Sequence, residues 1–78
     1  MKPIETNTSN CILTGGEGVA DLPVTRGMFN GSPVVESCWK LSHEEIEEVK
    51  RTGLVYFVCE GHTHPPILLA TESIVEVE

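Results

Sequence analysis

Long apolar runs are missing from this chain of 78 residues. The longest covers residues 54–59 and has six residues, whereas a membrane-spanning helix needs about 20. Residues 1–10 are polar and lack the apolar centre of a secretory signal. We therefore expect no membrane segment, a polar N-terminal tail over residues 1–10 and a cytoplasmic location.

Positive charge is scarce. Five Lys and Arg face twelve Asp and Glu, which gives a formal net charge of −7. A surface that follows phosphate groups along a nucleic acid needs clustered Lys and Arg, but only Lys50 and Arg51 are adjacent. Direct nucleic-acid binding is therefore not expected. The acidity favours solubility, and mimicry of DNA is the alternative interpretation.

Cysteines are few and have no partners by spacing. Cys11, Cys38 and Cys59 are odd in number and form no Cys-x-x-Cys pair, so no disulfide framework is predicted. Cys38 and Cys59 lie in or beside apolar segments, where reduced cysteine acts as a small hydrophobe, and we expect both to be buried. Cys59 with His62 and His64 offers zinc ligands, but the spacing matches no zinc finger, and no metal is predicted.

Catalytic motifs are absent as well. Histidine side chains suit acid–base roles, but no nucleophile with an activating base accompanies His62 and His64. The glycine-rich residues 15–18 lack the Lys-Ser/Thr that completes a phosphate-binding loop. We therefore expect neither enzymatic activity nor a cofactor.

The chain is also short of core material. A domain of this length buries roughly 60% of the surface of its unfolded chain, and such domains usually gain stability from disulfides, metals or partners. Aromatic residues make up only 5% of the chain. The single tryptophan, Trp39, is therefore expected in the core, with a ligand platform as the alternative.

Residues 54–59 are β-branched, aromatic and apolar on both faces, which predicts the central strand of a sheet. Because one short helix covers only one face of a sheet, the other face needs a partner. A homo-oligomer is expected. The alternative is a sandwich that the N-terminal strands close within one chain.

The clearest local pattern begins at Ser42. Ser42 and Glu45 have the Ser-x-x-Glu spacing of a capping box. Acidic residues follow at the start of the segment, basic residues lie near its end, and Gly53 provides a left-handed stop. A helix is predicted from Ser42 to about Thr52, packed on one face of the sheet.

The remaining segments predict short strands and turns. Residues 19–25 suit an edge strand because Pro23 cannot donate to a ladder, and turn-forming residues from Gly27 to Pro33 mark a loop or hairpin. Strands are also predicted over residues 34–41, 67–70 and 73–78, the second forming a hairpin with residues 54–59. The prediction is a single α+β domain over residues 11–78, a small, mainly antiparallel sheet with one short helix.

Three stretches resemble a group of short bacteriophage accessory proteins of unassigned activity. The stretches are Ser37-Cys38-Trp39-Lys40-Leu41-Ser42-x-Glu44-Glu45, Thr52-Gly53-Leu54-Val55-Tyr56 and Gly61-His62-x-His64-Pro65-Pro66-Ile67. They span roughly residues 33–71, about half of the chain. The resemblance implies a phage accessory protein that acts in the host cytoplasm.

The function expected from this resemblance is a role against host defence. Small phage proteins without catalytic motifs sequester nucleotide immune signals or bind a host protein. The groups suited to meet an anion are Arg26, Lys40, His62, Thr63 and His64. We expect an oligomeric binding module that sequesters a small anionic ligand. The alternative is an inhibitor or adaptor that binds a host protein through the acidic helix or a strand edge.

Overall fold

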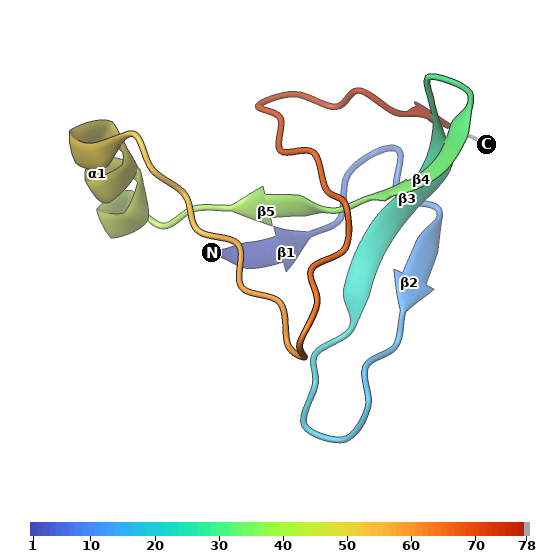
Figure 1. Ribbon diagram of the computed structural model, residues 1–78, viewed down its shortest axis with the longest axis horizontal. Helices are drawn as coiled ribbons and strands as arrows, with labels where there is room; N and C mark the ends of the chain where they lie inside the picture. Colours follow the sequence, from blue (N-terminus) through green and yellow to red (C-terminus); the bar gives the residue numbers. More distant parts are fainter. Residues whose placement is uncertain (78) are drawn as a thin grey trace.

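The computed structural model describes residues 1–77, which form six strands and one helix (Figure 1). The elements are β1 (Lys2–Ile4), β2 (Cys11–Leu13), β3 (Leu22–Phe29), β4 (Ser32–Glu36), β5 (Cys38–Lys40), α1 (His43–Thr52) and β6 (Glu76–Val77). All strand pairs are antiparallel. The α+β class, with a mainly antiparallel arrangement and one short helix, is confirmed.

Strand β3 is the centre of the larger sheet. It pairs with β4 through a hairpin whose two loop residues, Asn30 and Gly31, have positive φ angles of 50° and 78°. This two-residue turn matches the twist of antiparallel strands. Residues 19–25 were expected at an edge, but β3 has neighbours on both sides. Pro23 is accommodated because β4 pairs only from Thr25 onward, which leaves one side of Pro23 free of a strand.

The side of β3 opposite β4 is bonded by three pieces of chain in series. Strand β2 pairs with residues 22–24, and β6 pairs with Gly27 and Met28. Between them, the side chain of Asn10 acts like a strand residue. Its Oδ1 accepts from the Arg26 amide at 2.7 Å, and its Nδ2 donates to the Arg26 carbonyl at 3.0 Å. Both edges of β3 are therefore occupied, apart from the β4 side of residues 22–24.

The core is confined to β3. Val24 and Thr25 are the buried side chains of the described residues, and Gly27 is buried beside them. A methyl group at Gly27 would overlap the carbonyl oxygen of Glu76. Glycine is therefore required where β6 crosses β3.

Strands β1 and β5 form a separate two-stranded ribbon. Residues 2–4 were expected within a polar tail, but they pair with β5 in the register Lys2 to Lys40, Pro3 to Trp39 and Ile4 to Cys38. A turn closed by the Ser9 amide on the Thr6 carbonyl, at 3.2 Å, leads from this ribbon to β2. The first ten residues thus contribute to both sheets.

The helix α1 begins and ends where the sequence predicts. The Ser42 hydroxyl accepts from the Glu45 amide at 3.2 Å, Glu45 accepts from the Ser42 amide at 2.8 Å, and Gly53 is left-handed with φ 69°. The helix does not cover a sheet face as expected. It lies beyond the end of β5 (Figure 1), and none of its residues is buried. Its narrow apolar face, Ile46 and Val49, gives it little area to pack.

Residues 54–59 form no strand, nor do residues 67–70, so the predicted central hairpin is wrong. The chain from residue 53 to residue 73 runs as a long irregular connection between α1 and β6 (Figure 1). High β-propensity favours an extended backbone, but a strand also requires a free edge to pair with. At the centre of the larger sheet, β4 lies on one side of β3 and β2, Asn10 and β6 lie on the other, so residues 54–59 do not take the central place.

Candidate functional site

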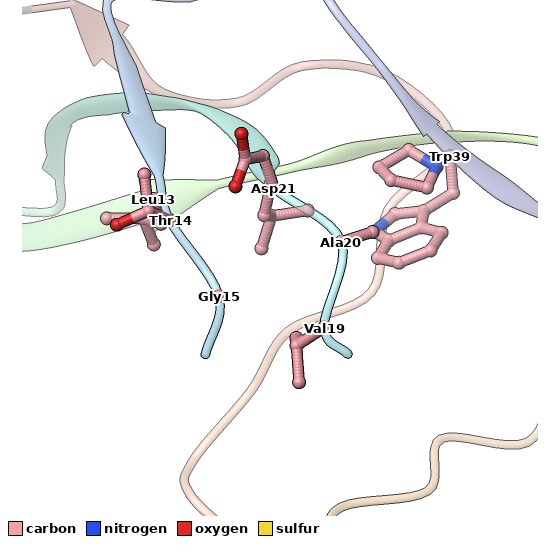
Figure 2. A pocket seen from close by; sticks show the side chains of 9 residues that line it. Leu13, Thr14, Gly15, Val19, Ala20, Asp21 and Trp39 are labelled. Carbon is pink, nitrogen blue, oxygen red and sulfur yellow. The ribbon is translucent and has the colours of Figure 1, made fainter. Parts of the chain in front are cut away.

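An apolar hollow of about 500 Å³ lies between the β1–β5 ribbon and the connection from β2 to β3 (Figure 2). It is lined by Pro3, Leu13, Thr14, Gly15, Val19, Ala20, Asp21, Leu22 and Trp39. Figure 2 shows Trp39 on one side of the hollow and Leu13 with Thr14 on the other.

Trp39 lines this hollow instead of a core, so the expected core position is wrong. Its Nε1 donates to the Ser37 hydroxyl at 2.8 Å, which holds the polar edge of the indole on its own strand. The side chain remains 46% exposed. The hollow suits a planar or aliphatic group packed on the indole. Asp21 in the lining disfavours an anion there.

A second hollow, of about 300 Å³, lies where the β1–β5 ribbon meets the start of α1. It is lined by Met1, Lys2, Lys40, Leu41, Ser42 and Glu45. Lys2 and Lys40 are direct cross-strand partners, so both side chains leave the same face of the ribbon with Cβ atoms about 5 Å apart. Two of the five Lys and Arg residues of the chain are thus held side by side.

The electrostatics of this hollow favour an anion. Like charges directly opposite each other on a ladder are destabilising, and neither lysine has an ion-pair partner among residues 1–77. The one carboxylate of the lining, Glu45, is engaged by the Met1 amino group at 2.6 Å and by the Ser42 amide. These two donors hold the pKa of Glu45 below its ordinary value. The two lysines therefore keep a surplus of positive charge.

The two hollows lie on opposite faces of the ribbon. Successive side chains of a strand point to opposite faces, so Trp39 and Lys40 diverge, as do Pro3 and Lys2. A small ligand held by the lysines therefore does not reach the indole of the same chain.

The structure does not gather the five predicted anion-binding residues in one place. Lys40 lines the second hollow, whereas Arg26, His62, Thr63 and His64 line neither hollow. Arg26 is exposed on β3. The ring of His64 packs edge-on against Phe57, with centroids 4.9 Å apart, and its Nδ1 lies 2.8 Å from the Pro65 carbonyl oxygen.

Of the six residues that line the second hollow, sequence reasoning placed only Lys40 in a site and missed Lys2 and Ser42 among the others. Lys2 lies in a polar segment with no strand pattern, and only the β1–β5 register brings it opposite Lys40. The Ser42 cap signal locates the helix start, but not what faces it. The sequence alone does not show that β1 pairs with β5, and this pairing is what forms the hollow.

The thiols and imidazoles form no metal cluster within residues 1–77. Cys11, Cys38 and Cys59 are free thiols. Cys38 is exposed and Cys59 is half-buried, so their expected burial is wrong. Neither packs in the core because the core consists of β3 alone.

Comparison with known proteins provides no relative. No protein-family model, no curated protein and no solved structure matches this chain. Among the described residues, no helix has the length and apolar character that a bilayer crossing demands.

Proposed function

We propose that this chain is a non-enzymatic binding module that works as a homo-oligomer and sequesters a small anionic ligand. The observation that carries the proposal is the direct opposition of Lys2 and Lys40 in a hollow at the start of α1. In the setting that the bacteriophage resemblance implies, the host cytoplasm, such a ligand is a nucleotide immune signal.

The local lysine pair outweighs the acidity of the whole chain at contact distance. The net charge of −7 repels anions, but charges farther away than about 8 Å are largely screened at physiological ionic strength. An anion placed between the lysines relieves their mutual repulsion and gains two charge-assisted hydrogen bonds. The site thus selects for a group with several acceptor oxygens, as in a phosphate.

The strength of this site in one chain is modest. Exposed ion pairs contribute about 0.2–1 kcal/mol each, so two exposed lysines alone hold an anion weakly. An assembly raises the effective concentration of such sites and allows one ligand with two phosphates to contact two copies. The weak binding expected of one chain therefore supports an oligomer as the form that sequesters a ligand.

Calorimetric titration with inorganic phosphate, a mononucleotide and a cyclic dinucleotide tests the proposal. At least one phosphate-bearing ligand is expected to bind the parent protein and to raise its Tm by mass action. Lys2→Gln and Lys40→Gln should each weaken binding several-fold, because each removes one of the two ammonium groups. Lys50→Gln is the matched control, since Lys50 lies on α1 and is paired with Glu47 at 3.7 Å.

Equal binding by Lys40→Gln and the parent would exclude the lysine pair as the site. An equal loss of ligand binding in Lys50→Gln would show that the weakening comes from the change in net charge and not from the lysine pair.

The alternative, an inhibitor or adaptor that docks on a host protein, is favoured by one observation. The helix α1 lies apart from both sheets with no buried residue, which leaves its acidic face free for a partner. However, Glu47 and Glu48 are paired with Lys50 and Arg51, which reduces the charge available. A host protein whose capture is lost with Glu44→Lys but kept with Lys40→Gln would support this alternative.

A further inference from the structure

The single chain exposes far more surface than a folded protein of its mass. Its accessible area is 6611 Å², whereas a folded monomer of 8.5 kDa exposes about 4,700 Å². The excess is about 1,900 Å² per chain by the same scaling. Standard interfaces bury about 800 Å² on each partner, and obligate dimers bury about 1,000–2,500 Å² on each partner. The excess therefore has the size of an obligate interface.

The dimensions of the chain agree with this area. Its radius of gyration is 13.8 Å, whereas a compact domain of 78 residues has about 11.5 Å. The buried side chains of the described residues are Val24 and Thr25. A core of this size does not hold a domain together by itself, so surface that is now exposed must become buried.

The excess apolar surface is concentrated in residues 54–69, here named the apolar segment. It makes up about a fifth of the chain but holds half of the large apolar side chains that are exposed. Tyr56 is 81% exposed, Val58 91% and Leu68 62%. Scattered exposed apolar residues are normal, but here they fall in two runs, residues 54–58 and 67–69, and such a concentration marks an interaction surface.

The backbone of the apolar segment is also unpaired. No backbone group from residue 55 to residue 73 bonds to another backbone group of the described residues. The sequence Leu54-Val55-Tyr56-Phe57-Val58-Cys59 nevertheless has the composition of a buried strand. A segment with free backbone donors and acceptors and with strand-forming side chains lacks only a neighbour to pair with.

The charge distribution identifies the neighbour. Two copies that each carry a net charge of −7 repel each other, so a contact between copies requires a surface poor in charge. The 19 residues from 53 to 71 contain one formally charged side chain, Glu60. Apolar surface that must be buried for the chain to fold also needs a partner that is present wherever the chain is made. A second copy of the chain meets this requirement.

We propose that the apolar segment is the contact surface for a second copy of this chain and that residues 54–59 pair there as an intermolecular strand. A two-fold contact places the same segment of each copy face to face. The inference deepens the oligomeric part of the proposed function and is independent of the lysine hollow, which lies on the β1–β5 ribbon.

Light scattering coupled to size exclusion tests the inference on the full chain. The mass is expected to be a multiple of 8.5 kDa at micromolar concentration, and the Tm is expected to rise with protein concentration. Val58→Glu introduces a charge where the side chain has almost no contacts within one chain, and it should raise the dissociation constant at least tenfold. The matched control is Val35→Glu, at an exposed position opposite Arg26 on β3, which should assemble like the parent.

A mass of 8.5 kDa with a Tm independent of concentration would overturn the inference. So would a Val58→Glu protein that assembles normally and has the parent's concentration-dependent Tm. If Val58→Glu unfolds, the concentration dependence of the parent's Tm still decides whether folding is coupled to assembly. Lys40→Gln should assemble like the parent, so a loss of anion binding in that variant leaves this inference standing.

Discussion

The hydroxyl of Ser42 satisfies the amide of Glu45, and the carboxylate of Glu45 satisfies the amide of Ser42 in return. Without such partners, the first amides of a helix have no acceptor within it. Because α1 packs on neither sheet, tertiary contacts contribute little to its stability, and the cap carries a large share. Local chemistry at residue 42 therefore decides whether the helix forms.

Ser42→Ala should lower the stability of α1 by about 1 kcal/mol, because it removes the acceptor for the Glu45 amide. The effect should appear as faster amide exchange in α1, while β3 stays protected, since the two regions share little packing. Ser42→Thr keeps the hydroxyl and serves as the control. Unchanged exchange in α1 of the alanine variant would contradict the role of the cap.

Glu45 predicts a pH dependence of the helix. The Met1 amino group and the Ser42 amide lower its pKa below 4.5, so the ionised carboxylate stabilises the folded form. This stabilisation is fully present above about pH 4.5 and is lost as the pH falls through the lowered pKa. Circular dichroism should show helix loss in that acidic range. Glu45→Gln should remove this step, whereas Glu44→Gln should retain it.

At the scale of elements, the larger sheet depends on the close crossing of β6 over Gly27. The C-terminal segment is also held by Glu36, whose carboxylate accepts from the Ser73 hydroxyl at 2.8 Å and from the Ile74 amide at 3.2 Å. These contacts connect the end of the chain to the middle of β3 and the end of β4. They hold the C-terminal end of the irregular connection, residues 53–73, beside Glu36 at the end of β4.

Gly27→Ala should destabilise the protein by about 1–3 kcal/mol, because the added methyl group overlaps the Glu76 carbonyl and forces β6 away. Urea denaturation measures the loss, and exchange of the Val77 amide shows whether β6 detaches. Gly16→Ala is the matched control, since a methyl group at residue 16 meets nothing within 4 Å. Equal stability of the two variants would show that β6 does not pack on Gly27.

Elements fixed by local signals could be predicted from the sequence, and elements fixed by distant pairing could not. The capping box and Gly53 determine α1 within a few residues of chain, and the predicted helix is confirmed. Strand β1 has no local signal, because it exists only through its register with β5. The same limit applies to the site, where Lys40 was predicted and its partner Lys2 was not.

Residues 54–59 show the reverse case, a strong local strand signal where the structure has no strand. Their composition is that of a central strand, yet β3 holds that place. The contacts of β3 come from β4 across the Asn30–Gly31 hairpin, from β2, from the Asn10 side chain and from β6. Propensity describes how well a segment fits a sheet, but not which segment occupies the available edges. The strand-forming pattern of residues 54–59 predicts a central strand within one chain, and the structure has no strand at these residues.

At the scale of the whole molecule, one copy buries a smaller share of its surface than a stable domain of similar length does. An unfolded chain of 8.5 kDa exposes about 12,300 Å², so a single copy with 6611 Å² exposed buries slightly less than half of that area. A stable domain of similar length buries roughly 60%. With the apolar segment pairing between copies as we propose, association and folding become one equilibrium, and the stability should rise with protein concentration.

The unpaired backbone of residues 55–73 has a consequence for turnover in the cell. Proteases cleave chain that enters their clefts in an extended form, and for most folded proteins that step waits for a local opening. The apolar segment of a lone copy needs no opening, so with the proposed pairing between copies, cleavage there competes directly with the encounter of a second copy. Encounter is second order in concentration and cleavage is first order. The half-life of the protein should therefore lengthen as its synthesis rate rises, which gives its abundance a threshold.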